Sequence, residues 1–224
     1  MIRNLIKPGD VVLDLGANFG WYTKFMAEIV QNEGKVFCIE PVPLNYNVLE
    51  GIIQSLHLDN VQIFHYAISD RNGKQTMAVP LTGSGEENLY EAKIVDDIAI
   101  SNMHTITVET RTLDTLFADL SKNIEFIKCD VEGHELKCLK GAEKIIKKFH
   151  PAWMIEVWGD PDDVSSQGYE TFQLLTHAGY QPYIYDGQRL YKRKTGDLQN
   201  DYFFLSLSHI ERLQRANLID IVSE

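Results

Sequence analysis

VVLDLGANFGWYT, residues 11–23, decides the fold of this chain. Residues 11–15 are apolar except for Asp14, and Gly16 and Gly20 follow directly. A short apolar run that passes through glycines into a helical pattern is typical of a buried strand, a tight turn and a helix. We therefore expect a strand at 11–15 and a helix at 20–31, joined by a turn that receives a ligand.

The same alternation of strand and helix patterns continues along the chain. Further strands are expected at 35–40, 60–66, 125–130, 151–157, 180–185 and 201–207, and further helices at 44–56, 112–120, 134–149 and 169–178. Nearly continuous apolar strands that alternate with helices predict a mostly parallel sheet with helices on both faces. The fold class is therefore α/β: a Rossmann-like sheet of seven strands whose last strand, formed by a terminal hairpin, is antiparallel.

Length and composition favour a single domain over residues 1–224. With 224 residues and 44% hydrophobic content, the chain can bury one sizeable core and is short for two. After a short additional strand near 73–80, residues 81–110 are polar and irregular and contain a Gly-Ser-Gly run. Long connections of this kind are often functional, so we expect a lid or an acceptor-binding insertion at 81–110.

Charge and composition exclude several partners. The formal net charge of −11 argues against nucleic acid, because phosphate backbones are held by Lys and Arg. No stretch approaches 18 consecutive apolar residues, so no membrane-spanning helix is expected. The three cysteines show no C-x-x-C pairing and are odd in number, and the first residues lack the features of a signal peptide. We expect buried, reduced thiols in a cytoplasmic protein.

The glycine turn indicates a ligand without a phosphate. It lacks the middle glycine that lets a pyrophosphate approach, and Asp14 adds a negative charge. Two like charges about 4 Å apart repel by about 1 kcal/mol in water and about 4 kcal/mol at an effective dielectric of 20. S-adenosylmethionine has no phosphate, carries a sulfonium and an ammonium, and offers a carboxylate to a helix N-terminus. Glu40, at the end of the second strand, is placed to accept its ribose hydroxyls. An ordinary strand-to-helix turn is the alternative interpretation of Gly16 and Gly20.

Several segments resemble the FkbM-type methyltransferases, a Rossmann-like family that uses S-adenosylmethionine. VLDLGANFGWYT is similar to their first motif, CIEPVPLNYNVL to the second and AISDRNG to the segment after the third strand, while TLDTL, FIKCDVEGHELKCLKGA and PAWMIEV follow in the family's order. The resemblance implies that the cofactor is contacted by Asp14, Gly16, Ala17, Asn18, Gly20, Glu40, Ala67, Ile68 and Ser69. It also implies that Asp130 faces the methionine end of the cofactor and the acceptor. Residues 52–57 depart from the family's asparagine-rich stretch, so no contact is carried over there.

The candidate catalytic residues are Asp130, Glu132 and His134, which follow the strand at 125–130. An acceptor hydroxyl must lose its proton, and a carboxylate at a strand end can orient or deprotonate it. Glu132 can also serve as a helix N-terminal charge, His134 is better read as an orienting or surface residue, and Glu135 is expected to be solvated or to interact with the helix dipole.

Two further interpretations concern the same rim. Asp130, Glu132, His134 and Glu156 also match the ligand chemistry of Mg²⁺, but their spacing does not require it, and no metal is expected. Trp153 and Trp158 are expected to pack in the core and at its rim rather than to form an acceptor platform.

The predicted function is therefore S-adenosylmethionine-dependent methyl transfer to a hydroxyl of a small molecule, sugar or glycan precursor. The oxygen acceptor is implied by the family resemblance alone. Two alternatives remain open: a non-catalytic cofactor-binding module with the same fold, and a nicotinamide-dependent oxidoreductase, which would need a phosphate-tolerant turn.

Overall fold

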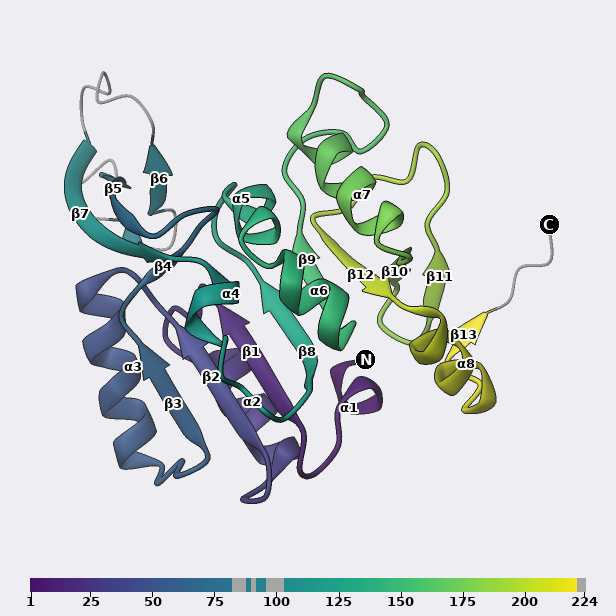
Figure 1. The fold of residues 1–224 in the computed structure, drawn as a ribbon, viewed down its shortest axis with the longest axis horizontal. Coiled ribbons are helices and arrows are strands. Elements are labelled where there is room, and N and C mark those ends of the chain that lie inside the picture. The colour runs from purple at the N-terminus through teal and green to yellow at the C-terminus, as the bar shows by residue number, and fades with distance from the viewer. Residues whose placement is uncertain (82–87, 90–91, 96–102, 221–224) are drawn as a thin grey trace.

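A nine-stranded sheet forms the centre of the computed structural model, which describes residues 1–81, 88–89, 92–95 and 103–220 (Figure 1). The order across the sheet is β13-β11-β10-β12-β9-β8-β1-β2-β3. In chain order these strands are β1 (Val11–Leu15), β2 (Lys35–Ile39), β3 (Val61–Phe64), β8 (Ile124–Cys129), β9 (Ala152–Glu156), β10 (Gln181–Tyr185), β11 (Leu190–Lys192), β12 (Asp201–Leu205) and β13 (Ile219–Asp220).

The strand order reverses between β1 and β8. From β1 the chain adds β2 and β3 on one side, and it later returns to add β8 and β9 on the other, with all of these neighbours parallel. All seven expected strands are present, and β12 is antiparallel to both β9 and β10 as predicted. The sheet also contains β11 and β13, which the prediction of seven strands missed. In an open sheet, ligands bind beyond the carboxyl ends of the strands at such a reversal.

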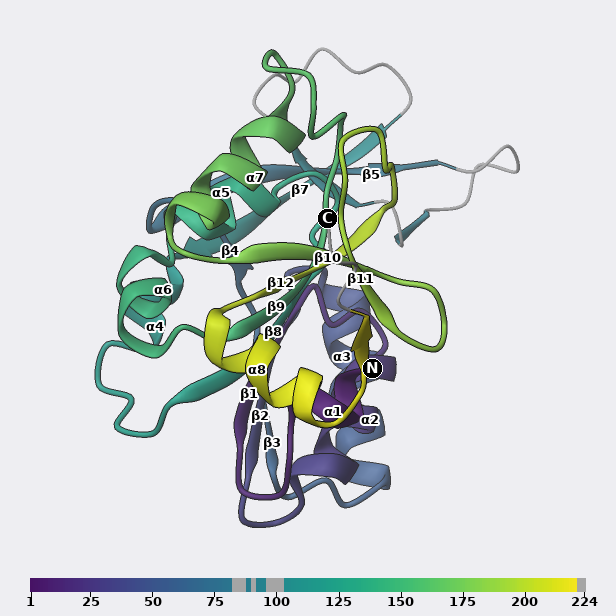
Figure 2. The same cartoon turned by 90° about the vertical axis from the view of Figure 1, so that its right-hand side faces the viewer.

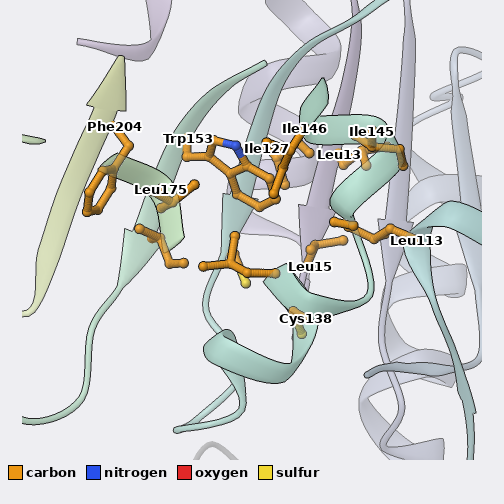
Figure 3. Close-up of a cluster of buried hydrophobic side chains, with 14 of the residues drawn as sticks. Leu13, Leu15, Leu113, Ile127, Cys138, Ile145, Ile146, Trp153, Leu175 and Phe204 are labelled. Atoms are coloured by element: carbon orange, nitrogen blue, oxygen red, sulfur yellow. The ribbon is translucent and has the colours of Figure 1, made fainter. Parts of the chain in front are cut away.

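Helices cover both faces of the sheet, as expected (Figure 2). One face carries α1 (Ile2–Leu5), α2 (Trp21–Val30), α3 (Pro43–Ser55) and α8 (Leu207–Arg215). The other carries α4 (Leu113–Leu116), α5 (Glu135–Lys140), α6 (Glu143–Phe149) and α7 (Gln167–His177). Figure 3 shows the core on this second face, where the indole of Trp153 packs among aliphatic side chains. Trp153 is fully buried, which confirms its expected place in the core.

The helix expected at 134–149 is two helices, α5 and α6. A Cβ at Gly141 would lie 2.1 Å from the carbonyl oxygen of Ser69, so the chain passes close against the strand-end segment and turns there. The carboxylate of Asp114 then accepts hydrogen bonds from the N–H groups of Lys144 and Ile145, which caps the new helix. Thr112 caps α4 as predicted by accepting from the N–H of Thr115, although α4 ends at Leu116.

A second sheet stands beside the first, in the order β4-β7-β5-β6. Its strands are β4 (Ala67–Ile68), β5 (Gly73–Pro80), β6 (Lys93–Val95) and β7 (Met103–Arg111). β5 confirms the additional strand expected near 73–80, whereas β7 shows that the end of segment 81–110 is regular rather than irregular. Residues 82–87, 90–91 and 96–102 of this segment lie outside the described residues. Within the ranges that the structure describes, no helix has the length and apolar character needed to cross a membrane.

Candidate functional site

A cavity of about 550 Å³ opens at the carboxyl ends of β1, β2 and β8, where the strand order reverses. It brings together most of the residues predicted from the sequence: Gly16, Ala17, Asn18, Gly20, Glu40, Ala67, Ile68, Asp130, Glu132 and His134. The other two, Asp14 and Ser69, are fully buried and do not line the cavity directly. One wall comes from the second sheet and its connections, through Met77, Leu89, Ala92 and Ile94, which the sequence analysis did not single out.

Two glycines shape the turn between β1 and α2. Gly16 has φ +74°, and a Cβ there would lie 1.8 Å from the carbonyl oxygen of Asp130. Gly20 has φ +82°, and its Cβ would lie 2.3 Å from Cδ1 of Leu49. Both positions combine a left-handed backbone with a close neighbour, so only glycine fits without a shift. The turn is therefore pressed against the end of β8, which fixes one wall of the cavity.

Glu40 stabilises the β1–α2 turn and the start of the segment after β2 through backbone hydrogen bonds. Its two carboxylate oxygens accept hydrogen bonds from the N–H of Asn18 at 2.8 Å and from the N–H of Val42 at 2.9 Å. Burial raises the pKa of Glu40 to about 6, which the two N–H donors partly offset. Oδ1 of Asn18 is buried and accepts no hydrogen bond from the described residues. The cavity therefore presents a carboxylate and an unsatisfied amide oxygen, both of which suit hydroxyl or ammonium donors.

Lys128, which the sequence analysis overlooked, is the buried cation beneath the cavity. Its amine lies 3.1 Å from the carboxylate of Asp130, 3.8 Å from that of Asp14, and 4.9 Å above the centre of the Tyr22 ring. Burial lowers the pKa of Lys128, but the two carboxylates outweigh this and raise it. Burial also raises the pKa of Asp14, which Lys128 and the hydroxyl of Thr23, 2.6 Å away, oppose. The signal that could have identified it is a lysine inside an apolar strand, two residues before Asp130, in a strand expected to end at the same rim as Asp14.

The turn after β8 is held from inside by Glu135. Its carboxylate accepts from the N–H groups of Val131 and Gly133, and the residue is only 1% exposed. Burial raises the pKa of Glu135 to about 7. Glu135 does stand in the first turn of α5, as the helix-dipole interpretation expected, but the expectation of a solvated side chain was wrong, because the backbone of the turn needs an acceptor that faces inward. Glu132, at the top of the turn, has φ +55° and lines the cavity.

His134 lines the cavity and is anchored to the neighbouring strand end. Its Nε2 lies 3.0 Å from the hydroxyl of Ser69, and both residues are buried, so His134 orients towards this partner rather than lying on the surface. Ser69 thereby connects the segment after β3 to the turn after β8.

Glu156 and Trp158 lie at the end of β9 and do not line this cavity. The indole N–H of Trp158 donates to the carboxylate of Glu156 at 2.7 Å, and the amine of Lys93 lies 5.5 Å from the centre of the indole ring. Trp158 is 42% exposed, consistent with its expected place at the rim. Across the described residues, no three His, Cys, Asp or Glu side chains lie close enough together to hold a metal ion.

Comparisons with known proteins agree with this arrangement. A family profile described as the methyltransferase FkbM domain matches residues 14–182. The 2-O-methyltransferase NoeI of Sinorhizobium fredii is 27% identical over 161 residues, which are 66% of this chain and 63% of that relative. This chain therefore spans less than two thirds of that relative.

Solved structures share the fold. A methyltransferase FkbM from Methylobacillus flagellatus KT superposes with a TM-score of 0.58 at 17% identity, covering 89% of this chain and 44% of that one. A fibrillarin from Aeropyrum pernix, crystallised with natively bound S-adenosyl-L-methionine, gives a TM-score of 0.51 at 11% identity and covers 89% of this chain and 67% of that one.

Proposed function

The chain belongs to the FkbM methyltransferase family, and on this premise we propose that it transfers a methyl group from S-adenosylmethionine to a hydroxyl of a small molecule, sugar or glycan precursor. The observation that carries the proposal is the charge of the cavity lining, in which carboxylates already pair with the lysines. Its lining includes the cations Lys24 and Lys128, and each is already paired with a carboxylate. A pyrophosphate would find no unpaired cation among the described lining residues, whereas a sulfonium compound meets carboxylates.

The residues present fit S-adenosylmethionine. Glu40 uses its two oxygens for two backbone N–H groups and keeps lone pairs for ribose hydroxyls. The buried Oδ1 of Asn18 offers an acceptor to an ammonium. Gly16 lets the turn lie against β8 without a side chain in the way. Ala67 and Ile68 provide an apolar wall for a nucleobase.

The chemistry assigned to this chain is acceptor positioning and proton removal. When bound, S-adenosylmethionine supplies a methyl carbon that its sulfonium has already activated for displacement. Positioning of the acceptor can contribute on the order of 7–11 kcal/mol in favourable cases. Asp130 and Glu132 line the cavity and are assigned to orient the acceptor hydroxyl and take its proton, while His134, anchored by Ser69, supports the turn that carries Glu132.

Lys128 is assigned to hold the carboxylate of Asp130 in place. The 3.1 Å contact fixes one carboxylate oxygen of Asp130, whose side chain is 39% exposed, while the other is left to face the acceptor.

Segment 81–110 is proposed as the lid or acceptor-binding insertion. Its described members Leu89, Ala92 and Ile94 already line the cavity from the second sheet. An apolar wall that closes over the cofactor end would exclude water from the reacting groups.

The proposal is tested by incubating the protein with methyl-labelled S-adenosylmethionine and a panel of hydroxylated metabolites and glycans, followed by mass spectrometry. We expect a labelled methyl ether product. Asp130→Asn and Glu132→Gln are made singly, with Asp119→Asn as a control at an exposed carboxylate outside the cavity. At least one of the two cavity variants should lose turnover by about 10²–10⁴-fold. Full turnover in both would contradict the assignment of the base.

A further inference from the structure

A second cavity, of about 660 Å³, lies beside the first on the face of the sheet that carries α2. Its walls include the aromatic side chains of Tyr22, Phe25, Tyr185 and Phe203, together with the polar Asn200 and Asp201. Tyr22 lines both cavities, so the two adjoin at this residue. The proposed methyl-transfer site gives no role to this second cavity.

The register of the sheet joins the two cavities. Lys128 of β8 pairs with Met154 of β9, which in turn pairs with Phe203 of β12. Neighbouring strands lie about 4.8 Å apart. Met154, which lines the second cavity, therefore lies one strand away from Lys128, which lines the first. Phe203, also in the second cavity, lies one strand further.

Three carboxylates form a row beside Lys128, Met154 and Phe203, each two residues along the chain from one of them. Side chains two residues apart on a strand share a face, so Asp130 lies on the face of Lys128, Glu156 on that of Met154, and Asp201 on that of Phe203. Glu156 and Asp201 are direct partners across β9 and β12. The row therefore leads from Asp130 in the first cavity to Asp201 in the second.

We propose that the second cavity is the acceptor subsite, and that it binds a neutral sugar whose reacting hydroxyl extends past Tyr22 to Asp130. This inference rests on the proposed function for the identity of the reaction, but the sugar site itself stands on the cavity and its walls. Aromatic walls bury the C–H faces of a sugar ring, and the carboxylate and amide side chains accept and donate to its hydroxyls.

The charges at this subsite select against other acceptors. An acidic sugar or a phosphorylated compound would place its negative charge beside Asp201 and the neighbouring Glu156. Met1 also lines this cavity, and burial lowers the pKa of its amino group, which disfavours the charged form that would attract an anion. A cationic amine would be attracted to Asp201, but on reaching Asp130 it would meet the ammonium of Lys128. A neutral polyol is repelled neither by the carboxylates nor by the ammonium of Lys128.

The experiment measures sugar binding directly, independently of turnover. A panel of methyl glycosides of common neutral hexoses and 6-deoxyhexoses, with a polyamine and a uronic acid as competitors, is titrated into the protein with and without S-adenosylhomocysteine. Saturation-transfer NMR and calorimetry report binding. The variants are Asn200→Trp, which fills the cavity, Asp201→Asn, which removes a charged acceptor at constant size, and Asp119→Asn, which is the matched control outside both cavities. Circular dichroism and thermal melting establish that each variant is folded.

We expect at least one neutral glycoside to bind the wild type, with about tenfold weaker binding in Asp201→Asn because a hydrogen bond to a charged group is lost. Asn200→Trp should abolish glycoside binding and leave S-adenosylhomocysteine binding unchanged, and Asp119→Asn should change neither. The inference is overturned if no neutral glycoside binds, if the polyamine or the uronic acid binds instead, or if Asn200→Trp binds the sugar as the wild type does. Failure of the proposed function is a different result: the wild type would bind neither S-adenosylmethionine nor S-adenosylhomocysteine.

Discussion

Replacement of Gly16 by alanine tests whether the contact between the β1–α2 turn and β8 shapes the site. Its Cβ would lie 1.8 Å from the carbonyl oxygen of Asp130 and 2.9 Å from the carbonyl carbon, and both atoms belong to backbone that cannot simply rotate away. The left-handed conformation costs an L-residue about 1–2 kcal/mol. Overpacking adds about 1–3 kcal/mol. The free energy of unfolding should therefore fall by roughly 2–5 kcal/mol.

Gly179→Ala separates the two contributions. Gly179 has φ +91°, but a Cβ there meets nothing within 4 Å, so this variant carries the conformational cost alone. Thermal unfolding of a chain of this size shifts by about 2–4 °C per kcal/mol, so Gly16→Ala should melt roughly 4–20 °C below the wild type and clearly below Gly179→Ala. Calorimetry should show S-adenosylmethionine affinity reduced by up to about a hundredfold in Gly16→Ala, since the turn must move away from β8, and retained in Gly179→Ala. Equal melting temperatures and equal affinities in the two variants would refute the reasoning.

Three further predictions concern buried charges and a helix cap. Lys128→Met leaves Asp14 and Asp130 without their cation and should lower the free energy of unfolding at neutral pH, measured in urea, by about 3–5 kcal/mol; an unchanged value would contradict the ion-pair account. Burial raises the pKa of Glu135 from 4.5 to about 7, so the folded state holds an extra proton between these pH values and stability should fall by roughly 3 kcal/mol as pH rises from 4.5 to 7. Denaturation at several pH values should show a flatter profile for Glu135→Gln, and an identical profile would count against the buried carboxylate. Asp114→Ala removes the acceptor for the first N–H groups of α6 and should cost about 1–2 kcal/mol in thermal unfolding, whereas Asp119→Ala should cost little.

The main sheet could be predicted because its strands bury both faces. Near-continuous apolar runs such as residues 11–15 and 151–157 leave few alternatives to a central parallel strand. The second sheet was harder to predict because its outer face is exposed. β7 alternates exposed positions with the inward-facing Ile106 and Val108, a period-two signal that the polar composition of the segment obscured.

The remaining differences arise from tertiary contacts. Apolar spacing continues through residues 134–149, but the approach of Gly141 to Ser69 and the Asp114 cap on α6 divide this segment into α5 and α6. Glu135 has the sequence appearance of a helix N-terminal charge, yet the turn before it folds its N–H groups onto that carboxylate. Patterns within one element do not report such contacts between elements.

The residues at strand ends were the most predictable part of the candidate site. Topology alone directs the ends of β1, β2 and β8 to one rim, which is why Gly16, Glu40 and Asp130 could be grouped before any coordinates. The sequence analysis missed Lys128 because its role depends on strand register. Lys128 faces Asp14 across the β1–β8 pair, and its amine lies over the ring of Tyr22 in α2.

The central claim is that the cavity at the β1–β8 reversal accepts a sulfonium nucleoside and rejects a pyrophosphate. Isothermal titration of S-adenosylmethionine and of NAD, into the wild type and Glu40→Ala, tests it most directly. The account predicts that the wild type binds S-adenosylmethionine and not NAD, and that Glu40→Ala loses most of this affinity. Binding of NAD without binding of S-adenosylmethionine would contradict it.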